Sequence, residues 1–436
     1  MSRLRIVGSY AQTKLRRFRS RAQLEAWQQV QVQRHLAELL PRSTYLGERF
    51  AGRPVQQWQQ LEPITKTEMM SNFSKLNTVG LSLEAAMEVA LAAEHSRDFS
   101  PELNGVTVGL SSGTSGHRGL FIVSPQERAD WAGQMLARLL PHPLPWPRRD
   151  RVAFFLRANS TLYESTRSVR VRFEYFDLIE ELSEQLPRLE ALAPTILVAP
   201  PSTLRMLARR RIEGTLSLAP IKIISVAEVL DPVDERLIRR AFGQTVHQVY
   251  QATEGFLGHS CSWGTLHLAE DVVAFDREPL DEHHFVPVIT DFRRVSQPIV
   301  RYRLNDVLRL RPVPCRCGSV TTALAAVEGR DDDVFVGRRA DGSERPLFAD
   351  FIRRAVLTAP VEVLDYGVRQ TAIDRLELYV DAVDPDRAFG SVAESIREIF
   401  VRMGCHPPTI EAVHDWPTGG MRKRKRVERG FVWEQR

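Results

Sequence analysis

The chain has 436 residues, more than one compact hydrophobic core usually contains, so a large domain with a smaller one is the first expectation. Its 43% hydrophobic and 26% charged residues are typical of a globular protein. No apolar run approaches the roughly 20 residues of a membrane helix, and the start lacks the apolar core of a secretory signal, so we expect no membrane association and a cytoplasmic location.

Positive charge, +5 overall, is concentrated at the two ends of the chain. Residues 1–21 carry seven Lys or Arg and no acid, and Arg422–Arg426 adds five more. An acid-free, arginine-rich start is also typical of a transit peptide. Because no nucleic-acid motif or interleaved aromatic residues accompany the N-terminal charges, a solvated surface is favoured there over a nucleic-acid partner.

The first predicted element is an amphipathic helix over Ser20–Leu40. Its apolar residues recur near one face, and Ser20 and Gln23 have the spacing of a capping box. A loop and helix region follows from Pro63 to about Glu94, and the strand-like GVTVGL then leads into a glycine-rich loop.

Further along, short apolar runs alternate with helical patterns at intervals of about 25 to 40 residues, which predicts crossover units. The runs are VAFFL (Val152–Leu156), TILVA (Thr195–Ala199), IKIISV (Ile221–Val226) and TVHQVY (Thr245–Tyr250). We therefore expect an α/β fold with mainly parallel sheets covered by helices. Ligands in such sheets bind beyond the carboxyl ends of the strands.

The pattern changes around Gly329–Asp333. A strand (Leu376–Val380), a helix (Ser391–Met403), a strand (Pro408–Val413) and a basic tail follow, enough for a small α+β lid domain. We place the boundary at Asp332, with a large domain over residues 1–332 and the mobile lid over residues 333–436.

The glycine-rich loop LSSGTSGHRG is a candidate anion cradle. Its glycines allow close backbone approach, its hydroxyls add donors, and Arg118 adds a planar cation. Neither the glycine spacing nor the ending is that of a P-loop, and a plain connection is the alternative. The candidate phosphate-binding residues are Ser111, Ser112, Gly113, Thr114, Ser115, Gly116 and Gly119.

Cys261, His267, Cys315 and Cys317 are a candidate zinc site. Three thiols and one imidazole match the number and softness of ligands around a tetrahedral structural Zn²⁺. His259 competes with His267 for this role, and free buried thiols are the alternative. Four cysteines in so long a chain do not indicate a disulfide scaffold.

Five stretches follow one another in a fixed order: the glycine-rich loop, SVAEVL (Ser225–Leu230), YQATEG (Tyr250–Gly255), IVRYRLNDVLRL (Ile299–Leu310) and EGRDDD (Glu328–Asp333). In this order they resemble the motif series of the adenylate-forming superfamily, which includes acyl-coenzyme A synthetases and peptide-synthetase adenylation domains. LEPITKTEM (Leu61–Met69) and PIVRYRLNDVLRL resemble more closely the phenylacetate-coenzyme A ligase branch, with its relatives that adenylate a deazaflavin coenzyme.

The resemblance implies that ATP and Mg²⁺ bind at these motifs. The glycine-rich loop would hold the β- and γ-phosphates, Thr253 would contact the α-phosphate and Glu254 would hold Mg²⁺, since a hard cation prefers carboxylate oxygens. Asp306 would accept both ribose hydroxyls, although it is also placed to pair with Arg301 or Arg303. The remaining nucleotide- and acyl-binding residues implied are Ser225, Ala227, Glu228, Tyr250, Gln251 and Arg330, with Asp332 as the hinge.

The superfamily also implies a catalytic lysine near the C-terminus. Aligning Arg426-Val427 with the end of its motif places this lysine at Lys423, but Arg422 stands where glycine is expected, so Lys425 is an alternative. The glycine-rich loop is one residue short, and Arg118 takes the place of its lysine. A cation cluster is what charge development on the α-phosphoryl group requires.

The resemblance implies ATP-dependent adenylation of a carboxylic acid, with an aromatic acid expected, followed by transfer to coenzyme A. A carrier protein or an amine are alternative acceptors, and an adenylyltransferase acting on a non-acyl molecule is the alternative enzyme. A nucleotide- or nucleic-acid-binding protein is the non-enzyme hypothesis. The oligomeric state is open, a homodimer included.

Overall fold

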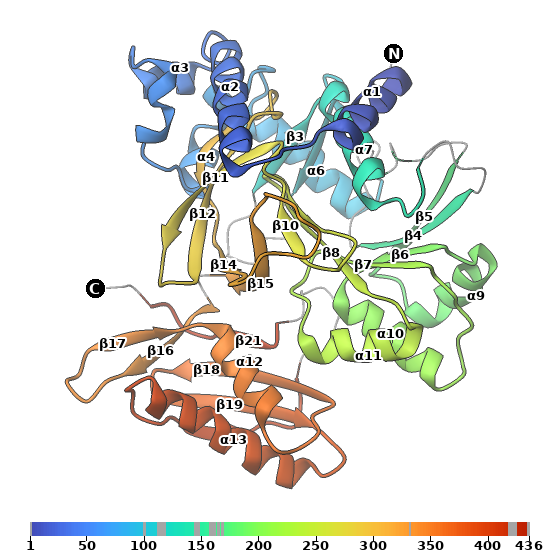
Figure 1. Cartoon of the computed structure of the whole chain (residues 1–436), viewed down its shortest axis with the longest axis vertical. Helices are drawn as coiled ribbons and strands as arrows, with labels where there is room; N and C mark the ends of the chain where they lie inside the picture. The colour runs from blue at the N-terminus through green and yellow to red at the C-terminus, as the bar shows by residue number, and fades with distance from the viewer. Residues whose placement is uncertain are drawn as a thin grey trace.

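The computed structural model describes residues 2–98, 102–110, 119–143, 149–156, 163, 166, 170–330, 333–416 and 425–433. Figure 1 shows a large body of helices and sheets, with the orange and red C-terminal elements forming a smaller unit beside it. No helix in the described part of the chain is long and apolar enough to cross a membrane.

Helices dominate the N-terminal part of the large body. The helix predicted over Ser20–Leu40 is confirmed: the Ser20 side chain accepts a hydrogen bond from the Gln23 amide (3.2 Å), and one face, including Leu24 and Leu36, is buried. The helices are α1 (Ser2–Leu15), α2 (Arg21–Leu39), α3 (Thr44–Phe50), the 3-10 helix η1 (Val55–Gln60), α4 (Lys66–Ser71), α5 (Phe73–Leu76) and α6 (Leu83–Ser96).

Some of the basic N-terminal residues pair with acidic residues elsewhere in the large body. Arg5 pairs with Asp130, and Arg21 pairs with the buried carboxylate of Glu270 at 2.7 Å. These charges therefore serve packing of α1 and α2.

Twelve of the described strands form one sheet, in the order β11-β12-β14-β15-β10-β9-β8-β7-β6-β4-β5, with β13 beside β12. The strands from β5 to β8 pair in parallel, and the others pair antiparallel. Their bounds are β4 (Asp150–Leu156), β5 (Val171–Asp177), β6 (Ile196–Ala199), β7 (Lys222–Ser225), β8 (Val246–Ala252), β9 (Gly255–Ser260), β10 (Leu266–Leu268), β11 (Val273–Pro279), β12 (His284–Asp291), β13 (Ile299–Arg303), β14 (Asp306–Leu310) and β15 (Ala323–Arg330).

The parallel strands read as continuous apolar runs because both of their faces are covered. Phe155 and Leu197 belong to one buried cluster, and their chain neighbours Phe154 and Val198 belong to another. The helices around this part of the sheet are α7 (Pro125–Leu139), α9 (Leu182–Leu192), α10 (Pro201–Ile212) and α11 (Pro232–Phe242). A separate three-stranded sheet contains β1 (Glu102–Leu103), β2 (Val106–Leu110) and β3 (Leu120–Val123).

The smaller unit has its own core, and the α/β fold with a small C-terminal α+β domain is confirmed. Two helices cover a sheet of order β20-β19-β18-β21, and Cys405 is buried in this core. The elements are β16 (Phe335–Arg338), β17 (Glu344–Leu347), α12 (Ala349–Thr358), β18 (Asp365–Ala372), β19 (Arg375–Asp381), α13 (Pro385–Arg402), β20 (Thr409–Ala412) and β21 (Val427–Arg429). The hinge predicted at Asp332 lies outside the described residues.

Candidate active site

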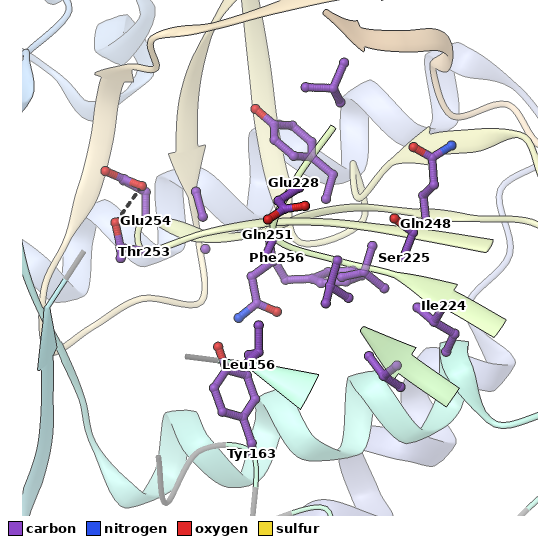
Figure 2. Close-up of a pocket in the computed structure, with 18 of the residues that line it drawn as sticks. Leu156, Tyr163, Ile224, Ser225, Glu228, Gln248, Gln251, Thr253, Glu254 and Phe256 are labelled. Carbon is purple, nitrogen blue, oxygen red and sulfur yellow. Dashed lines mark hydrogen bonds between the residues drawn. The ribbon is translucent and has the colours of Figure 1, made fainter. Parts of the chain in front are cut away.

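A cavity of about 630 Å³ lies where the carboxyl ends of β7 and β8 meet β13, β14, β15 and the small domain. Thr253 and Glu254 lie at one end of the view in Figure 2, and Leu156, Tyr163 and Ile224 lie away from them. The cavity thus has a polar end and an apolar end.

Glu254 lies at the polar end, in the turn between β8 and β9. Its side chain accepts hydrogen bonds from the Tyr302 hydroxyl (2.9 Å) and from the Thr253 hydroxyl (2.9 Å). Burial, together with the charge of Glu254, raises the pKa of Tyr302, so the phenol stays a donor. Two hydroxyl groups therefore fix the carboxylate where β8 ends.

Asp306 begins β14 close to the same turn. Its carboxylate accepts a hydrogen bond from the Tyr250 hydroxyl at 2.6 Å, and its strand register pairs it with Arg330 on β15. Arg301 makes an ion pair with Asp276 and Arg303 with Glu278. Residues from YQATEG, the RYR stretch and EGRDDD thus meet at one end of the cavity.

The segment after β7 forms another wall. Ser225 is 2% exposed, and Ala227 has a left-handed backbone (φ 66°), a conformation that non-glycine residues rarely adopt and that is common at functional sites. Glu228 accepts a hydrogen bond from the Ser202 amide in the first turn of α10 (3.3 Å). Ser225, Ala227, Glu228 and Gln251 all line the cavity.

The apolar end is lined by aromatic side chains that sequence reasoning did not find. The Tyr163 ring lies 4.8 Å from Phe154 and 5.6 Å from Trp131, and Phe154 lies 5.3 Å from Phe173. Figure 2 shows the Gln251 side chain pointing toward Leu156 and Tyr163. These aromatic residues come from separate apolar elements, and no motif marks them.

Several charged residues at the cavity were also missed, among them Lys66 and Asp291. Lys66 is the first residue of α4, and two backbone hydrogen bonds between Ile64 and β13 (2.8 and 2.9 Å) hold its segment in place. Its pKa is lowered by burial, which the charge of Glu254 opposes. Burial raises the pKa of Asp291 to about 6. The LEPITKTEM resemblance was the available signal for Lys66.

Lys425 reaches the cavity from the small domain, where its Nζ pairs with the Asp333 carboxylate (2.7 and 2.9 Å). The predicted Lys423 and Arg118 lie outside the described residues, as do Ser111, Ser112, Gly113, Thr114, Ser115 and Gly116. Gly119 is buried directly before β3.

The four predicted metal ligands lie together beside β9 and β10. Their ligand atoms lie within 4.8 Å of one another, with Cys261 Sγ 3.7 Å from Cys315 Sγ and Cys317 Sγ 3.4 Å from His267 Nε2. Tetrahedral Zn²⁺ with Zn–S of about 2.3 Å and Zn–N of about 2.0 Å requires about 3.8 and about 3.5 Å for these separations.

The tautomer of His267 also fits a metal ligand. Its Nδ1 lies 3.2 Å from the Thr321 carbonyl oxygen and 3.1 Å from the Thr321 hydroxyl; in the tautomer with the proton on Nδ1, that proton goes to the carbonyl and the Nε2 lone pair is left for a metal. His259 lies outside the cluster of described ligand atoms, although its residue pairs with His267 across the strands. The geometry thus fits zinc with His267 as the fourth ligand.

Solved structures share this fold, whereas no protein-family model and no curated protein matches the chain. A 2-hydroxyisobutyryl-CoA ligase in its postadenylation state with 2-HIB-AMP superposes with a TM-score of 0.66 at 16% identity, over 94% of this chain and 89% of that one. The same ligase in its thioesterification state, with 2-HIB-AMP and CoA, gives 0.52 at 16% identity over 94% and 91%. An anthranilate CoA ligase with anthranoyl-AMP gives 0.52 at 11% identity over 72% and 65%. The chain therefore has the fold of the adenylate-forming ligases.

Proposed function

We propose that this protein is an ATP-dependent acid–thiol ligase that activates a carboxylic acid as its adenylate and transfers the acyl group to coenzyme A. One observation carries the proposal: a polar end and an aromatic end belong to the same cavity. The polar end holds Glu254, Asp306, Arg330 and Lys425. The shared fold supports it, and the neighbours with this fold include ligases bound to acyl-AMP.

In the first step a carboxylate oxygen of the acid attacks the α-phosphorus of ATP. The bond from that phosphorus to the bridging oxygen of the β-phosphate breaks, and pyrophosphate leaves with the electron pair. Lys425 neutralises charge that develops on the α-phosphoryl group, and the Thr253 hydroxyl exchanges its hydrogen bond to Glu254 for one to this group. Asp306 accepts from the ribose hydroxyls. Catalysis comes from positioning, with no covalent bond to the protein.

Mg²⁺ is expected with the nucleotide. Glu254 presents a carboxylate at the cavity, with the Thr253 hydroxyl beside it, and such hard oxygen donors suit this cation. Bound there, Mg²⁺ would supply charge neutralisation for the phosphates.

In the second step the sulfur of a thiol attacks the carbonyl carbon of the adenylate. The bond from that carbon to the phosphate oxygen breaks, AMP leaves, and the thiol proton passes to solvent. The rings of Trp131, Phe154, Tyr163 and Phe173 favour an aromatic acid, because flat apolar rings pack well in a chamber lined by other rings.

For the cysteine and histidine cluster we propose a structural Zn²⁺. Four protein ligands complete a tetrahedral shell, which is typical of structural and not catalytic zinc. The metal would tie the turn after β9 to the loop between β14 and β15.

The test is pyrophosphate release from Mg·ATP with a panel of aryl and alkyl acids, in the presence of hydroxylamine. We expect aryl acids to give both pyrophosphate and a hydroxamate, because hydroxylamine captures only an activated carboxylate. Pyrophosphate with a stable adenylated product and no hydroxamate would establish the adenylyltransferase alternative. No pyrophosphate with any acid or cofactor candidate would contradict both.

A further inference from the structure

A buried group of charged side chains joins the two domains beside the cavity. Arg205 and Asp234 come from α10 and α11 of the large domain. In the small domain, Asp365 begins β18 and Arg426 directly precedes β21. Each is 8% exposed or less. We call these four residues the interdomain cluster.

Arg426 is the centre of the cluster. Its guanidinium donates to both carboxylate oxygens of Asp234, in one case at 2.8 Å, and also to Asp365 at 2.8 Å. Arg205 donates to the other oxygen of Asp365. Burial disfavours the charge of Arg426, but its hydrogen bond to Asp234 and the nearby carboxylates raise its pKa well above the ordinary value. The arginine therefore stays charged.

Two pairs of the cluster, Arg426 with Asp234 and Arg205 with Asp365, join the domains and form only when the domains are docked as observed. Two arginines and two aspartates cancel in charge, and the two-pronged geometry of Arg426 on Asp234 requires a specific orientation. A buried charge that loses its partner costs far more than a surface pair contributes. A second contact confirms the same docking: the Tyr366 hydroxyl donates to Asp231 at 2.6 Å.

The residue before Arg426 is Lys425, which lines the cavity. The Arg426 carbonyl oxygen accepts a hydrogen bond from the Val368 amide on β18 (2.7 Å), so the backbone at this point is part of the small domain's sheet. The Arg426 side chain reaches the large domain while Lys425 reaches Asp333 at the cavity. Docking through Arg426 thus fixes where Lys425 lies.

We propose that Arg426 is a positioning residue for the adenylation half-reaction, because its pairing with Asp234 and Asp365 docks the small domain so that Lys425 faces the cavity. The proposal rests on the proposed ligase function. The large domain's α10 and α11 supply the docking surface. The fold also superposes better on the postadenylation state than on the thioesterification state of one and the same ligase, with TM-scores of 0.66 and 0.52.

The test separates the two half-reactions in Arg426→Gln. Pyrophosphate release measures adenylation, and thioester formation from a supplied synthetic acyl-adenylate and coenzyme A measures transfer. We expect kcat for adenylation to fall by about 100-fold with KM for ATP changed by less than about threefold, because a misplaced group acts in the transition state. Transfer should stay within about threefold of the wild type. An equal loss in both half-reactions, or no loss in adenylation, would overturn the proposal.

Asp234→Asn is the second variant, since it removes the same contact from the other domain and keeps the side-chain shape. We expect the same selective loss, and a thermal melt checks that each variant is folded. Arg209→Gln is the matched control: this arginine also lies on α10 and also pairs with the small domain, at Asp381, but the pair is about 40% exposed at 3.4 Å. It should leave both half-reactions unchanged.

Hydrogen exchange tests the docking without any substrate. In Arg426→Gln and Asp234→Asn, the amides in the first turns of α10 and α11 and along β21 should exchange faster than in the wild type, and Arg209→Gln should not change them. Unchanged exchange in both cluster variants contradicts the docking role, whether or not the protein adenylates acids. If the wild type releases no pyrophosphate but the variants still exchange faster, the proposed ligase function is contradicted. The docking contact is then established independently of that function.

Discussion

Lys425 and Arg426 are neighbours in the sequence, yet they lie in opposite surroundings. Both line the cavity, but the lysine is half-buried and pairs with Asp333, whereas the arginine is 8% exposed and pairs across the two domains. The sequence predicts one catalytic lysine in this run of five basic residues, but it does not show that the adjacent residues Lys425 and Arg426 have different roles. Only the contacts that each side chain makes with the rest of the protein show which of the two faces a substrate and which joins the domains.

We predict that Lys425→Ala lowers kcat for pyrophosphate release by about 100-fold, because removing one donor to a developing anion costs about that much. Lys423→Ala should lower it by less than tenfold. Steady-state kinetics of both variants with Mg·ATP and the best acid of the panel check this. A large loss of kcat in Lys423→Ala, with kcat unchanged in Lys425→Ala, would instead identify Lys423 as the catalytic lysine.

His35 on α2 provides a pH-dependent prediction. Burial lowers its pKa to about 4, and its Nε2 donates to the Arg294 carbonyl (3.1 Å), which partly opposes the shift. The unfolded chain therefore takes up this proton first, near pH 6.5, and the free energy of unfolding falls as the pH drops from 6.5 toward 4.

Between pH 7 and pH 5 this residue should account for a loss of about 2 kcal/mol of unfolding free energy. We expect His35→Gln, whose amide can still donate to the Arg294 carbonyl, to show a correspondingly smaller loss. Urea unfolding of both proteins at the two pH values measures it. Equal losses in wild type and variant would contradict a neutral buried imidazole.

At the level of elements, the metal cluster ties together strands that are distant in the chain. Cys261 follows β9, His267 lies in β10, and Cys315 and Cys317 lie between β14 and β15. Strand β10 has only three residues, so a tetrahedral metal would supply much of the order at this part of the sheet.

We predict about one zinc ion per chain by elemental analysis, lost in Cys317→Ser. The midpoint of thermal unfolding should fall by about 3 °C, the shift that a loss of about 3 kcal/mol gives a chain of this size. Cys405→Ser is the control, because this cysteine is buried in the small domain, away from the cluster. Equal zinc content in Cys317→Ser and the wild type would contradict the assignment.

The arrangement of the strands also explains why the polar end of the cavity could be predicted. Ser225 ends β7, Glu254 follows β8, and Asp306 begins β14, so each motif residue lies at a strand end and sheet topology brings these ends together. The aromatic end could not be predicted. Strands such as β4 are apolar on both faces, and the sequence does not say whether Phe154 or Phe155 faces a ligand.

At the level of the whole molecule, the domain contacts were beyond sequence analysis. Arg426 and Asp234 are 192 residues apart, and Arg205 and Asp365 are 160 apart. Each reads as an ordinary helix or strand residue in its own segment. Periodicity identifies which face of an element is buried, but it carries no information about which charges meet when two finished domains dock.

Val427, the buried residue that begins β21, also determines the alignment of the basic run with its neighbouring strand. In Arg422–Arg426 side chains two apart are identical in type, so a shift of β21 by two residues along β18 would bring Lys423 to the cavity and another arginine between the domains. The same shift would move Lys425 into the position of Val427, which is 4% exposed in the small domain's core. Burying an unpaired ammonium there is strongly unfavourable. The apolar side chain of Val427 therefore determines which of two similar registers β21 adopts along β18. The register in turn determines which of the two lysines reaches the cavity.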